Sequence, residues 1–378
     1  MQQINMKSRQ LFPLGKAYGD AFCNRVLETQ KLIGNIESGK HTFLFAPRRY
    51  GKSSLCEKAF EKITISHLIL DFHLAVTGKD AERILVKGIN DLIWQSIGSI
   101  EKLSHVVKQY AKRLKPKLGI GSEHFRLELE IVDQNNIYEN ISEAFLILEK
   151  LLKEKNKNAV LLLDEFQEIG MMDEGRGIEG AIRHVAQETQ YLALIFSGSS
   201  PHLMKNMFED ERRPLYKLCR KLVLERMHAS DYQTHLNKAS EMMWHCPLSD
   251  IVFQKIMTLT ECHPYYVNYL CDELWSQCQS CPTKDEVIEA WHRTVDEERS
   301  DLLKDFFTLS DNQRRVMIYL ANEGGSNIYA MDAAKIMDMP VSSISRAMAT
   351  LIEKDFVEKV DDQYQLIVPA YKILLSKV

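Results

Sequence analysis

Three adjacent residues near the start of the chain have the types and spacing of a phosphate-binding site. Gly51, Lys52 and Ser53 end the pattern G-x-x-x-x-G-K-[ST], in which backbone N–H groups and a lysine bind phosphates. The Lys52 ammonium suits β- and γ-phosphates, and the Ser53 hydroxyl suits Mg²⁺. One position departs from the pattern, because Ala46 stands where the first glycine is expected.

The residues around this motif predict the elements that position such a loop. Thr42–Phe45 is a short apolar and β-branched run, typical of a buried strand. Leu55 and Ala59 begin an apolar pattern at helical spacing after the loop. Pro47 biases Ala46 toward an extended conformation, in which its methyl group is tolerated. The alternative is a Gly-Lys-Ser turn that joins two elements and binds no ligand.

A second group with chemical potential is an acidic pair. Ala159–Leu163 has the composition of a strand buried on both faces of a parallel sheet, and Asp164 and Glu165 follow it directly. We predict that Asp164 is a ligand of Mg²⁺ and that Glu165 orients and polarises an attacking water. A strand that simply ends in solvated charge is the alternative.

Small hydroxyl residues form a third group after the apolar run Tyr191–Phe196. We predict that Ser199 reaches the γ-phosphate or the water, with Ser197 as the alternative; a plain serine N-cap is also open. His67–Asp71 and Lys221–Leu224 are two further apolar runs. Five strands alternating with helical stretches predict a parallel α/β sheet with helices on both faces.

The order of these motifs resembles that of the archaeal-type ATPases, a branch of the AAA+ and STAND P-loop ATPases. The segments that carry the resemblance are Phe22-Cys-Asn-Arg25 with a displaced Glu28, Ala46–Leu55, Asp164–Gln167, Ser197–Ser200, Pro214–Tyr216 and His263–Tyr266. The resemblance implies an ATPase that binds ATP or ADP with Mg²⁺, and a P-loop NTPase fold with a helical lid.

The resemblance also implies which residues contact the nucleotide. His263 and Pro264 are expected over the adenine, with Pro264 packed on the base. The complete set of expected nucleotide contacts is Arg25, Ala46, Pro47, Arg48, Arg49, Tyr50, Gly51, Lys52, Ser53, Ser54, His263 and Pro264.

The chain departs from the family pattern at two further places. Cys262 stands where the family has glycine, and Lys217-Leu218 stand where it has Gly-Arg. The second change removes an arginine suited to the γ-phosphate, so we assign this catalytic role to Arg213, with Arg212 and Arg220 as alternatives. An arginine finger contributes orders of magnitude in rate, so we expect nucleotide binding with slow hydrolysis.

The pattern of elements predicts three domains. Residues 1–228 are expected to form the ATPase core and 301–378 a winged helix-turn-helix domain, and the helical stretch 229–300 is the lid that the resemblance implies. The elements predicted for the last domain are helices at Asp311–Ala321, Ala333–Met337 and Val341–Lys354, then two strands around the turn Asp361-Asp362.

Composition limits the partners. The net charge of −4 gives no overall positive field for nucleic acid or membrane. DNA binding through 310–378 is kept only as an alternative. This segment has eight Lys or Arg against nine Asp or Glu, whereas a DNA-binding domain usually has a basic face. An unidentified protein partner is favoured, and self-association is open. The basic stretch Lys108–Lys117 is expected at a helix end before a hairpin at Gly119–Val132, as a solvated face or a contact for an acidic partner or nucleic acid.

The sequence also allows predictions about the compartment of the protein and the state of its cysteines. No apolar run reaches bilayer-spanning length and no signal-peptide core is found, which predicts a cytoplasmic protein without membrane insertion. The eight cysteines are expected to be reduced thiols, with a zinc site near Cys278 and Cys281 as the alternative.

These observations together predict a nucleotide-dependent molecular switch. ATP and Mg²⁺ would sit between sheet and lid, slow hydrolysis would release the lid, and the C-terminal domain would report the state to a partner. Two alternatives stay open: a replication-initiator-like DNA-binding ATPase, and a nucleotide-binding scaffold without turnover.

Overall fold

The computed structural model describes residues 11–97, 114–120, 125–131, 136–360 and 362–376. The contacts divide the chain into two compact units. One unit comprises Met1–Arg25, Arg49–Ser54 and Glu225–Val378, and the other comprises Val26–Arg48 and Leu55–Leu224. The division falls inside the Gly-Lys-Ser loop, so each unit is described by itself.

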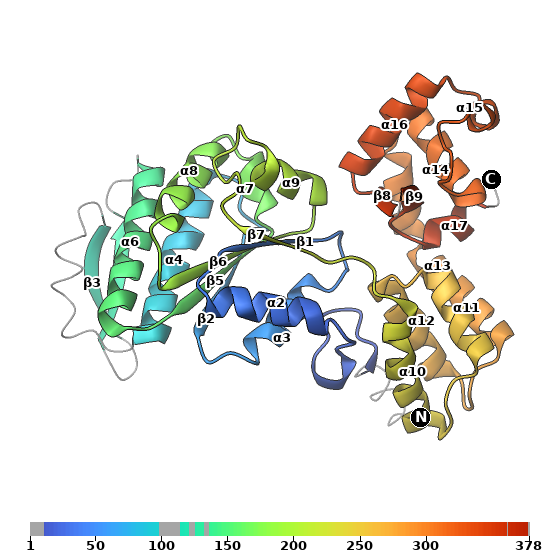
Figure 1. The fold of residues 1–378 in the computed structure, drawn as a ribbon, viewed down its shortest axis with the longest axis horizontal. Coiled ribbons are helices and arrows are strands. Elements are labelled where there is room, and N and C mark those ends of the chain that lie inside the picture. Colours follow the sequence, from blue (N-terminus) through green and yellow to red (C-terminus); the bar gives the residue numbers. More distant parts are fainter. Residues whose placement is uncertain (1–10, 98–113, 121–124, 132–135, 361, 377–378) are drawn as a thin grey trace. The chain divides into compact units, whose positions relative to one another are not determined.

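The unit that contains 55–224 is built on a five-stranded parallel sheet with the order β2-β5-β6-β1-β7 (Figure 1). Its strands are β1 Thr42–Phe45, β2 Ser66–Asp71, β5 Ala159–Asp164, β6 Leu192–Gly198 and β7 Arg220–Val223. All five predicted strands are present, which confirms the predicted α/β fold with a parallel sheet.

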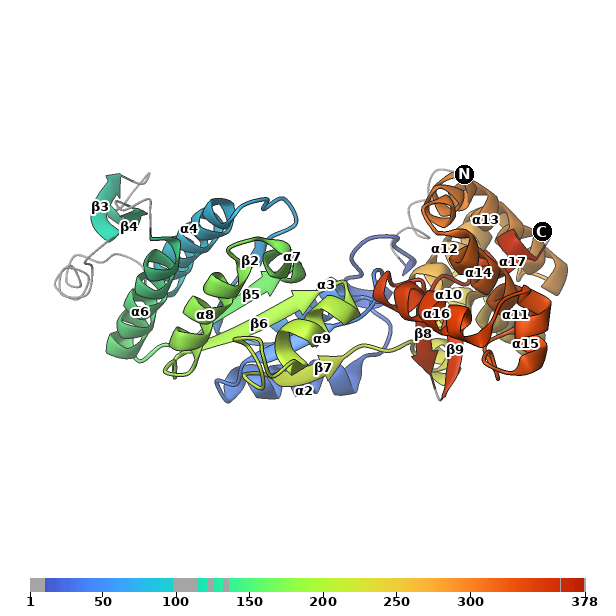
Figure 2. The same ribbon diagram turned by 90° about the horizontal axis from the view of Figure 1, so that it is seen from above.

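Helices cover both faces of this sheet (Figures 1 and 2). On one face lie α2 Val26–Glu37 and α3 Lys52–Phe60; on the other lie α4 Gly78–Ile97, α6 Ile137–Lys155, α7 Gln167–Met171, α8 Gly175–Ala186 and α9 Pro201–Glu209. Successive strand side chains alternate between faces. Leu161 and Leu163 accordingly join the buried cluster of the second face, whereas Leu162 is buried outside that cluster.

An antiparallel hairpin is added after α4, formed by β3 Leu114–Ile120 and β4 Phe125–Ile131. The prediction of a helix end is therefore wrong for Leu114–Lys117, which lie in β3; residues 108–113 lie outside the described ranges. Lys115 stands opposite Glu130, and opposite charges favour cross-strand pairing. The Asn90 side chain of α4 also bonds both backbone groups of Leu129, at 3.1 and 2.8 Å.

The other unit is mainly helical. Its elements are the short 3₁₀ helix η1 Gly19–Ala21, the helices α10 Ala229–Trp244, α11 Asp250–Thr260, α12 Pro264–Gln277, α13 Lys284–Phe307, α14 Asp311–Glu323, α15 Met331–Met337 and α16 Val341–Glu353, the strands β8 Val357–Val360 and β9 Gln363–Leu366, and α17 Ala370–Leu375. The helices and the C-terminal hairpin (β8 and β9) expected for this part are present. Asp361, in the expected turn, lies outside the described residues.

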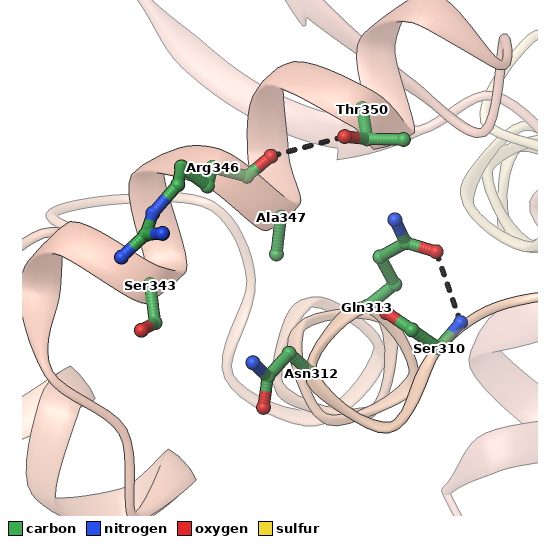
Figure 3. Close-up of a pocket in the computed structure, with 7 residues that line it drawn as sticks. All are labelled: Ser310, Asn312, Gln313, Ser343, Arg346, Ala347 and Thr350. Carbon is green, nitrogen blue, oxygen red and sulfur yellow. Dashed lines mark hydrogen bonds between the residues drawn. The ribbon is translucent and has the colours of Figure 1, made fainter.

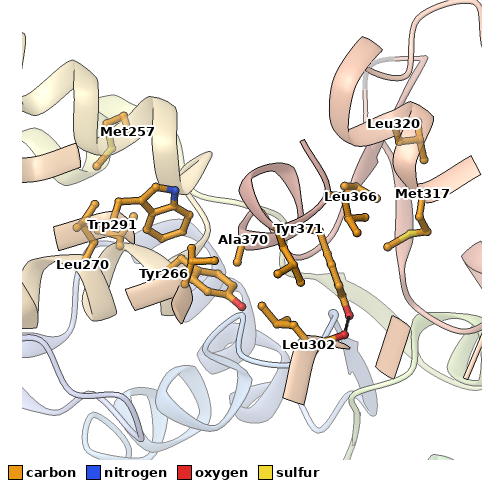
Figure 4. Close-up of a cluster of buried hydrophobic side chains, with 14 of the residues drawn as sticks. Met257, Tyr266, Leu270, Trp291, Leu302, Met317, Leu320, Leu366, Ala370 and Tyr371 are labelled. Atoms are coloured by element: carbon orange, nitrogen blue, oxygen red, sulfur yellow. Dashed lines mark hydrogen bonds between the residues drawn. The ribbon is translucent and has the colours of Figure 1, made fainter. Parts of the chain in front are cut away.

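A single buried cluster runs through this unit (Figure 4). It joins Trp291 of α13 and Met317 of α14, and Tyr371 of α17 donates a hydrogen bond to the Leu302 carbonyl at 3.1 Å. Phe12 belongs to the same cluster. Helix α13 continues past residue 300, so the elements on both sides of that predicted boundary share one core.

Two cysteines of this unit correct an expectation. Cys246 and Cys281 form a disulfide across 35 residues of sequence, so the prediction of reduced thiols is wrong for this pair. Cys246 follows α10 and Cys281 precedes α13, and only the packing of these helices brings the two together. Their spacing in the sequence carries no signal of this contact.

Candidate functional site

The acidic and hydroxyl residues predicted for chemistry meet at the carboxyl edge of the parallel sheet. Strand β6 lies between β5 and β1, and the Phe166 N–H donates to the Ser197 carbonyl at 2.8 Å. This bond continues the pairing beyond the strand ends, where Glu165 and Ser199 stand. Ala46, the first residue after β1, leaves the sheet at the same edge because β1 pairs with β6 in parallel.

Glu165 is fixed by two side chains. The Ser199 hydroxyl donates to Glu165 Oε2 at 2.6 Å, and Gln167 Nε2 donates to the same oxygen at 2.5 Å. Gln167 in turn accepts from the Ser199 N–H at 3.2 Å. Ser199 and Gln167 are buried, and Glu165 has a left-handed backbone with φ of 50°. Such a backbone at a non-glycine residue is common where a structure holds a functional group in place.

Gln167 had no role in the sequence-based prediction. It belongs to the Asp-Glu-Phe-Gln segment that resembles the archaeal-type ATPases, and this was the only signal for it. Ser197, the alternative to Ser199, contributes its carbonyl to the strand end, as described above. The structure thus joins Glu165 to the preferred serine.

The loop after β1 takes left-handed conformations at two positions. Arg49 has φ of 66° and Gly51 has φ of 89°, whereas Ala46 is not among the described residues with positive φ. Alternating backbone of this kind directs N–H groups toward an anion. Lys52 begins α3 and is 7% exposed, and Ser54 Oγ accepts the Ala17 N–H at 2.9 Å.

Other residues expected at the nucleotide pack around the loop. Arg25 donates to the Tyr50 carbonyl at 3.4 Å and to the Glu225 carbonyl at 2.6 Å. His263 is buried against the Tyr50 ring, and Pro264 is the first residue of α12. Burial, followed by the charge of Arg226, lowers the pKa of His263 well below its ordinary value, so its imidazole is neutral.

Arg213, predicted as the arginine finger, forms an ion pair with Glu179 of α8. Its side chain is 15% exposed and that of Glu179 is fully buried. Burial raises the pKa of Glu179 to about 7, and the Arg213 guanidinium opposes this shift. Arg212, the alternative, pairs with the neighbouring Asp210 at 2.7 Å and is exposed. A catalytic role for Arg213 stays a prediction.

A pocket of about 190 Å³ lies between α14 and α16 (Figure 3). Its lining residues are mostly polar: Ser310, Asn312, Gln313, Ser343, Arg346, Ala347 and Thr350. At the start of α14, the Ser310 N–H donates to Gln313 Oε1 at 3.0 Å in a capping box. None of these residues was predicted for the nucleotide, so the pocket is a separate feature of the C-terminal segment.

The fold and the residues at the sheet edge define a class of protein. A parallel sheet with a Gly-Lys-Ser loop after β1, an acidic pair at the end of β5 and a hydroxyl pair after β6 is the arrangement of a P-loop NTPase. The family described as an ATPase domain predominantly from Archaea matches residues 22–270, and the chain belongs to this family.

Solved structures agree with this class at the level of fold. The chain is similar to the Walker-type ATPase of Pyrococcus abyssi, with 16% identity, a TM-score of 0.66 and coverage of 97% of this chain and 99% of that chain. It is also similar to the ORC2 protein of Aeropyrum pernix, solved in ADPNP and ADP complexes, with 13% identity, a TM-score of 0.53 and 94% coverage of each chain. The comparison with curated proteins gave no match. In the described ranges, no helix has the length and apolar character required to cross a membrane.

Proposed function

We propose that this protein binds ATP with Mg²⁺, hydrolyses it slowly and acts as a nucleotide-dependent molecular switch. The observation that carries the proposal is the Glu165 carboxylate, bonded to Ser199 and Gln167 at the sheet edge where the loop leaves β1. A carboxylate in a fixed orientation is suited to align a water for attack on a phosphate. Membership of an ATPase family supports the same reaction.

The hydroxyl and carboxylate oxygens predicted to bind a metal fit Mg²⁺, which prefers oxygen ligands in proteins. The Ser53 hydroxyl and the Asp164 carboxylate would hold the ion. Asp164 ends β5, and its carboxylate accepts the Glu165 N–H at 3.1 Å, which orients the acidic pair. When bound, Mg²⁺ supplies positive charge that neutralises phosphate oxygens.

Lys52 and the N–H groups of 49–53 would bind the β- and γ-phosphates, as the family pattern implies. Arg213 would act on the γ-phosphate, in place of the arginine that the family pattern has and this chain lacks. The rest of the nucleotide would contact Arg25, Ala46, Pro47, Arg48, Ser54, His263 and Pro264.

We further propose that the chain works as three parts, namely a core at 1–228, a lid at 229–300 and a winged helix at 301–378. The succession α14, α15 and α16 followed by the C-terminal hairpin supports the last assignment. Because the last two parts share a buried cluster through α13, we expect them to respond together when nucleotide binds.

Calorimetry with ATP and ADP, each with Mg²⁺, combined with a phosphate-release assay, tests the proposal. We expect binding of both nucleotides and slow release of phosphate from ATP. Binding without any release would favour a scaffold that does not turn over. Absence of binding would reject the proposal.

Ser199→Ala is expected to slow ATP hydrolysis by about 10- to 100-fold, because Glu165 loses a hydrogen bond to its charged carboxylate. The matched control is Ser197→Ala, which removes a hydroxyl two residues earlier, within β6. Single-turnover assays on both variants decide the assignment. A larger loss in the Ser197 variant would reverse it.

Ala46→Gly is expected to change ATP affinity by less than about tenfold, ~1.4 kcal/mol. Ala46 is outside the left-handed region, so its methyl group adds little strain and glycine relieves none. Calorimetry with ATP and Mg²⁺ on the two proteins checks this. Binding that appears only with glycine would mean that the loop had lost its function.

DNA binding by the C-terminal segment is the second candidate, favoured by the polar pocket beside α16. Arg346 and Ser343 of α16 line it, and a third helix of this kind can enter a major groove. Fluorescence anisotropy with duplex DNA at several salt concentrations tests it, since phosphate contacts weaken as salt rises. We expect a protein partner to be the preferred ligand, so tight salt-dependent DNA binding that Arg346→Ala weakens would favour the alternative.

A further inference from the structure

The side chain of Tyr50 is buried, although it stands within the phosphate-binding loop. It is 1% exposed, and its ring packs edge-on against His263 with centroids 4.7 Å apart. Its hydroxyl lies 3.0 Å from Glu358 Oε1 and 3.2 Å from Arg226 Nε. Burial raises the pKa of the Tyr50 phenol, so the hydroxyl stays protonated and donates to Glu358. A carboxylate of the C-terminal hairpin thus holds a residue of the loop.

Arg226 holds Glu358 in this position. Its Nε donates to Glu358 Oε1 at 2.9 Å, its Nη1 to Glu261 Oε2 at 2.7 Å and its Nη2 to the Leu366 carbonyl at 2.8 Å. The side chain is 11% exposed, and each of its three nitrogens has a partner. Since Glu261 follows directly after α11 and Leu366 ends β9, the guanidinium ties the predicted lid to the C-terminal hairpin.

A second carboxylate, that of Glu298, binds Arg49, the residue before Tyr50. The Arg49 guanidinium lies 4.0 Å from the centre of the Tyr265 ring and 2.9 Å from Glu298 Oε1. Tyr265 and Tyr266 donate to Glu298 at 2.8 and 2.6 Å. The left-handed backbone of Arg49 is unfavourable for a residue with a Cβ, so these contacts stabilise a conformation that the loop does not favour by itself.

We propose that the Tyr50 hydroxyl, Glu358 and Arg226 position the loop for phosphate binding, so that the C-terminal hairpin sets nucleotide affinity. This inference rests on the proposed ATP site. The left-handed residues Arg49 and Gly51 flank Tyr50, and they orient N–H groups toward an anion. Because Tyr50 is already fixed between them, the loop loses less conformational entropy when a phosphate binds. Glu358 acts through Tyr50 and is a positioning residue.

Two conservative variants of the full chain test the proposal. Tyr50→Phe removes the hydroxyl and keeps the ring against His263, and Glu358→Gln removes the charge and keeps the shape. Each is expected to raise the Kd for ATP with Mg²⁺ by about 3- to 30-fold in calorimetry. For Glu358→Gln, the rate of a single turnover at saturating ATP is expected to stay within about twofold, because the contacts of Glu165 are unchanged.

The combined variant separates a shared contact from two unrelated effects. The variant with both Tyr50→Phe and Glu358→Gln is expected to bind ATP no more weakly than the weaker single variant, because the two substitutions disrupt the same contact. Lys359→Gln is the matched control, since Lys359 is the next hairpin residue and pairs with Asp362 at 2.7 Å. Its affinity is expected to match that of the wild type.

Each other outcome overturns a specific statement. If the wild type binds ATP and both single variants bind equally well, the positioning role is wrong and the ATP site stands. Fully additive losses in the combined variant would also reject the shared contact. If the wild type binds no ATP, the proposed function fails together with this inference.

Discussion

Lys52→Ala is expected to weaken ATP binding by at least about a hundredfold, ~2.7 kcal/mol, and so to abolish it at ordinary concentrations. Lys52 is the lysine of the Gly-Lys-Ser motif and begins α3, where the helix N-terminus already favours an anion. In the proposed site, its ammonium would add a full charge and charge-assisted hydrogen bonds to the β- and γ-phosphates. Alanine keeps the helix but supplies neither.

Calorimetry with ATP and Mg²⁺ measures this effect. The matched control is Lys58→Ala, because Lys58 lies in the same helix and pairs with Glu61 at 2.8 Å. We expect the control to bind as the wild type does, and circular dichroism to show both variants folded. Near-normal affinity in the Lys52 variant would remove the assignment of the loop as the nucleotide site.

Glu165→Gln is expected to keep ATP affinity within about threefold and to lower turnover by about 10²- to 10⁴-fold, the range for a lost catalytic base. Glutamine has the same shape and retains an oxygen that can accept from Ser199 and Gln167. It loses the negative charge that we propose polarises the water. The variant therefore separates binding from chemistry.

Steady-state phosphate release and calorimetry on the same preparations check this prediction. Glu188→Gln, on an exposed position after α8, is the control and should behave as the wild type. If the Glu165 variant hydrolyses ATP normally, Glu165 is a structural charge at a strand end. If neither protein turns over, the nucleotide-binding scaffold becomes the better description.

The sequence was sufficient for the sheet and for the position of each motif within it. Buried parallel strands are continuous apolar runs, so Thr42–Phe45 and Ala159–Leu163 could be recognised locally. A stretch rich in charged residues has no apolar pattern of this kind. For that reason the sequence predicts a helix end at Leu114–Lys117, although pairing with the partner strand β4 makes this segment part of β3.

Contacts between distant residues were decided by the tertiary structure alone. Gln167 reaches Ser199 only because β5 and β6 are neighbours, and the order of strands in a sheet leaves no local signal. Tyr50 and Glu358 are 308 residues apart in the sequence, yet their side chains share a hydrogen bond. The sequence by itself determined which residues are of types suited to binding and hydrolysing a nucleotide, and it predicts these roles for them, because residue type and spacing are local properties. Which side chains hold those residues in place was decided by packing, because a hydrogen bond depends on distances that only the folded chain defines.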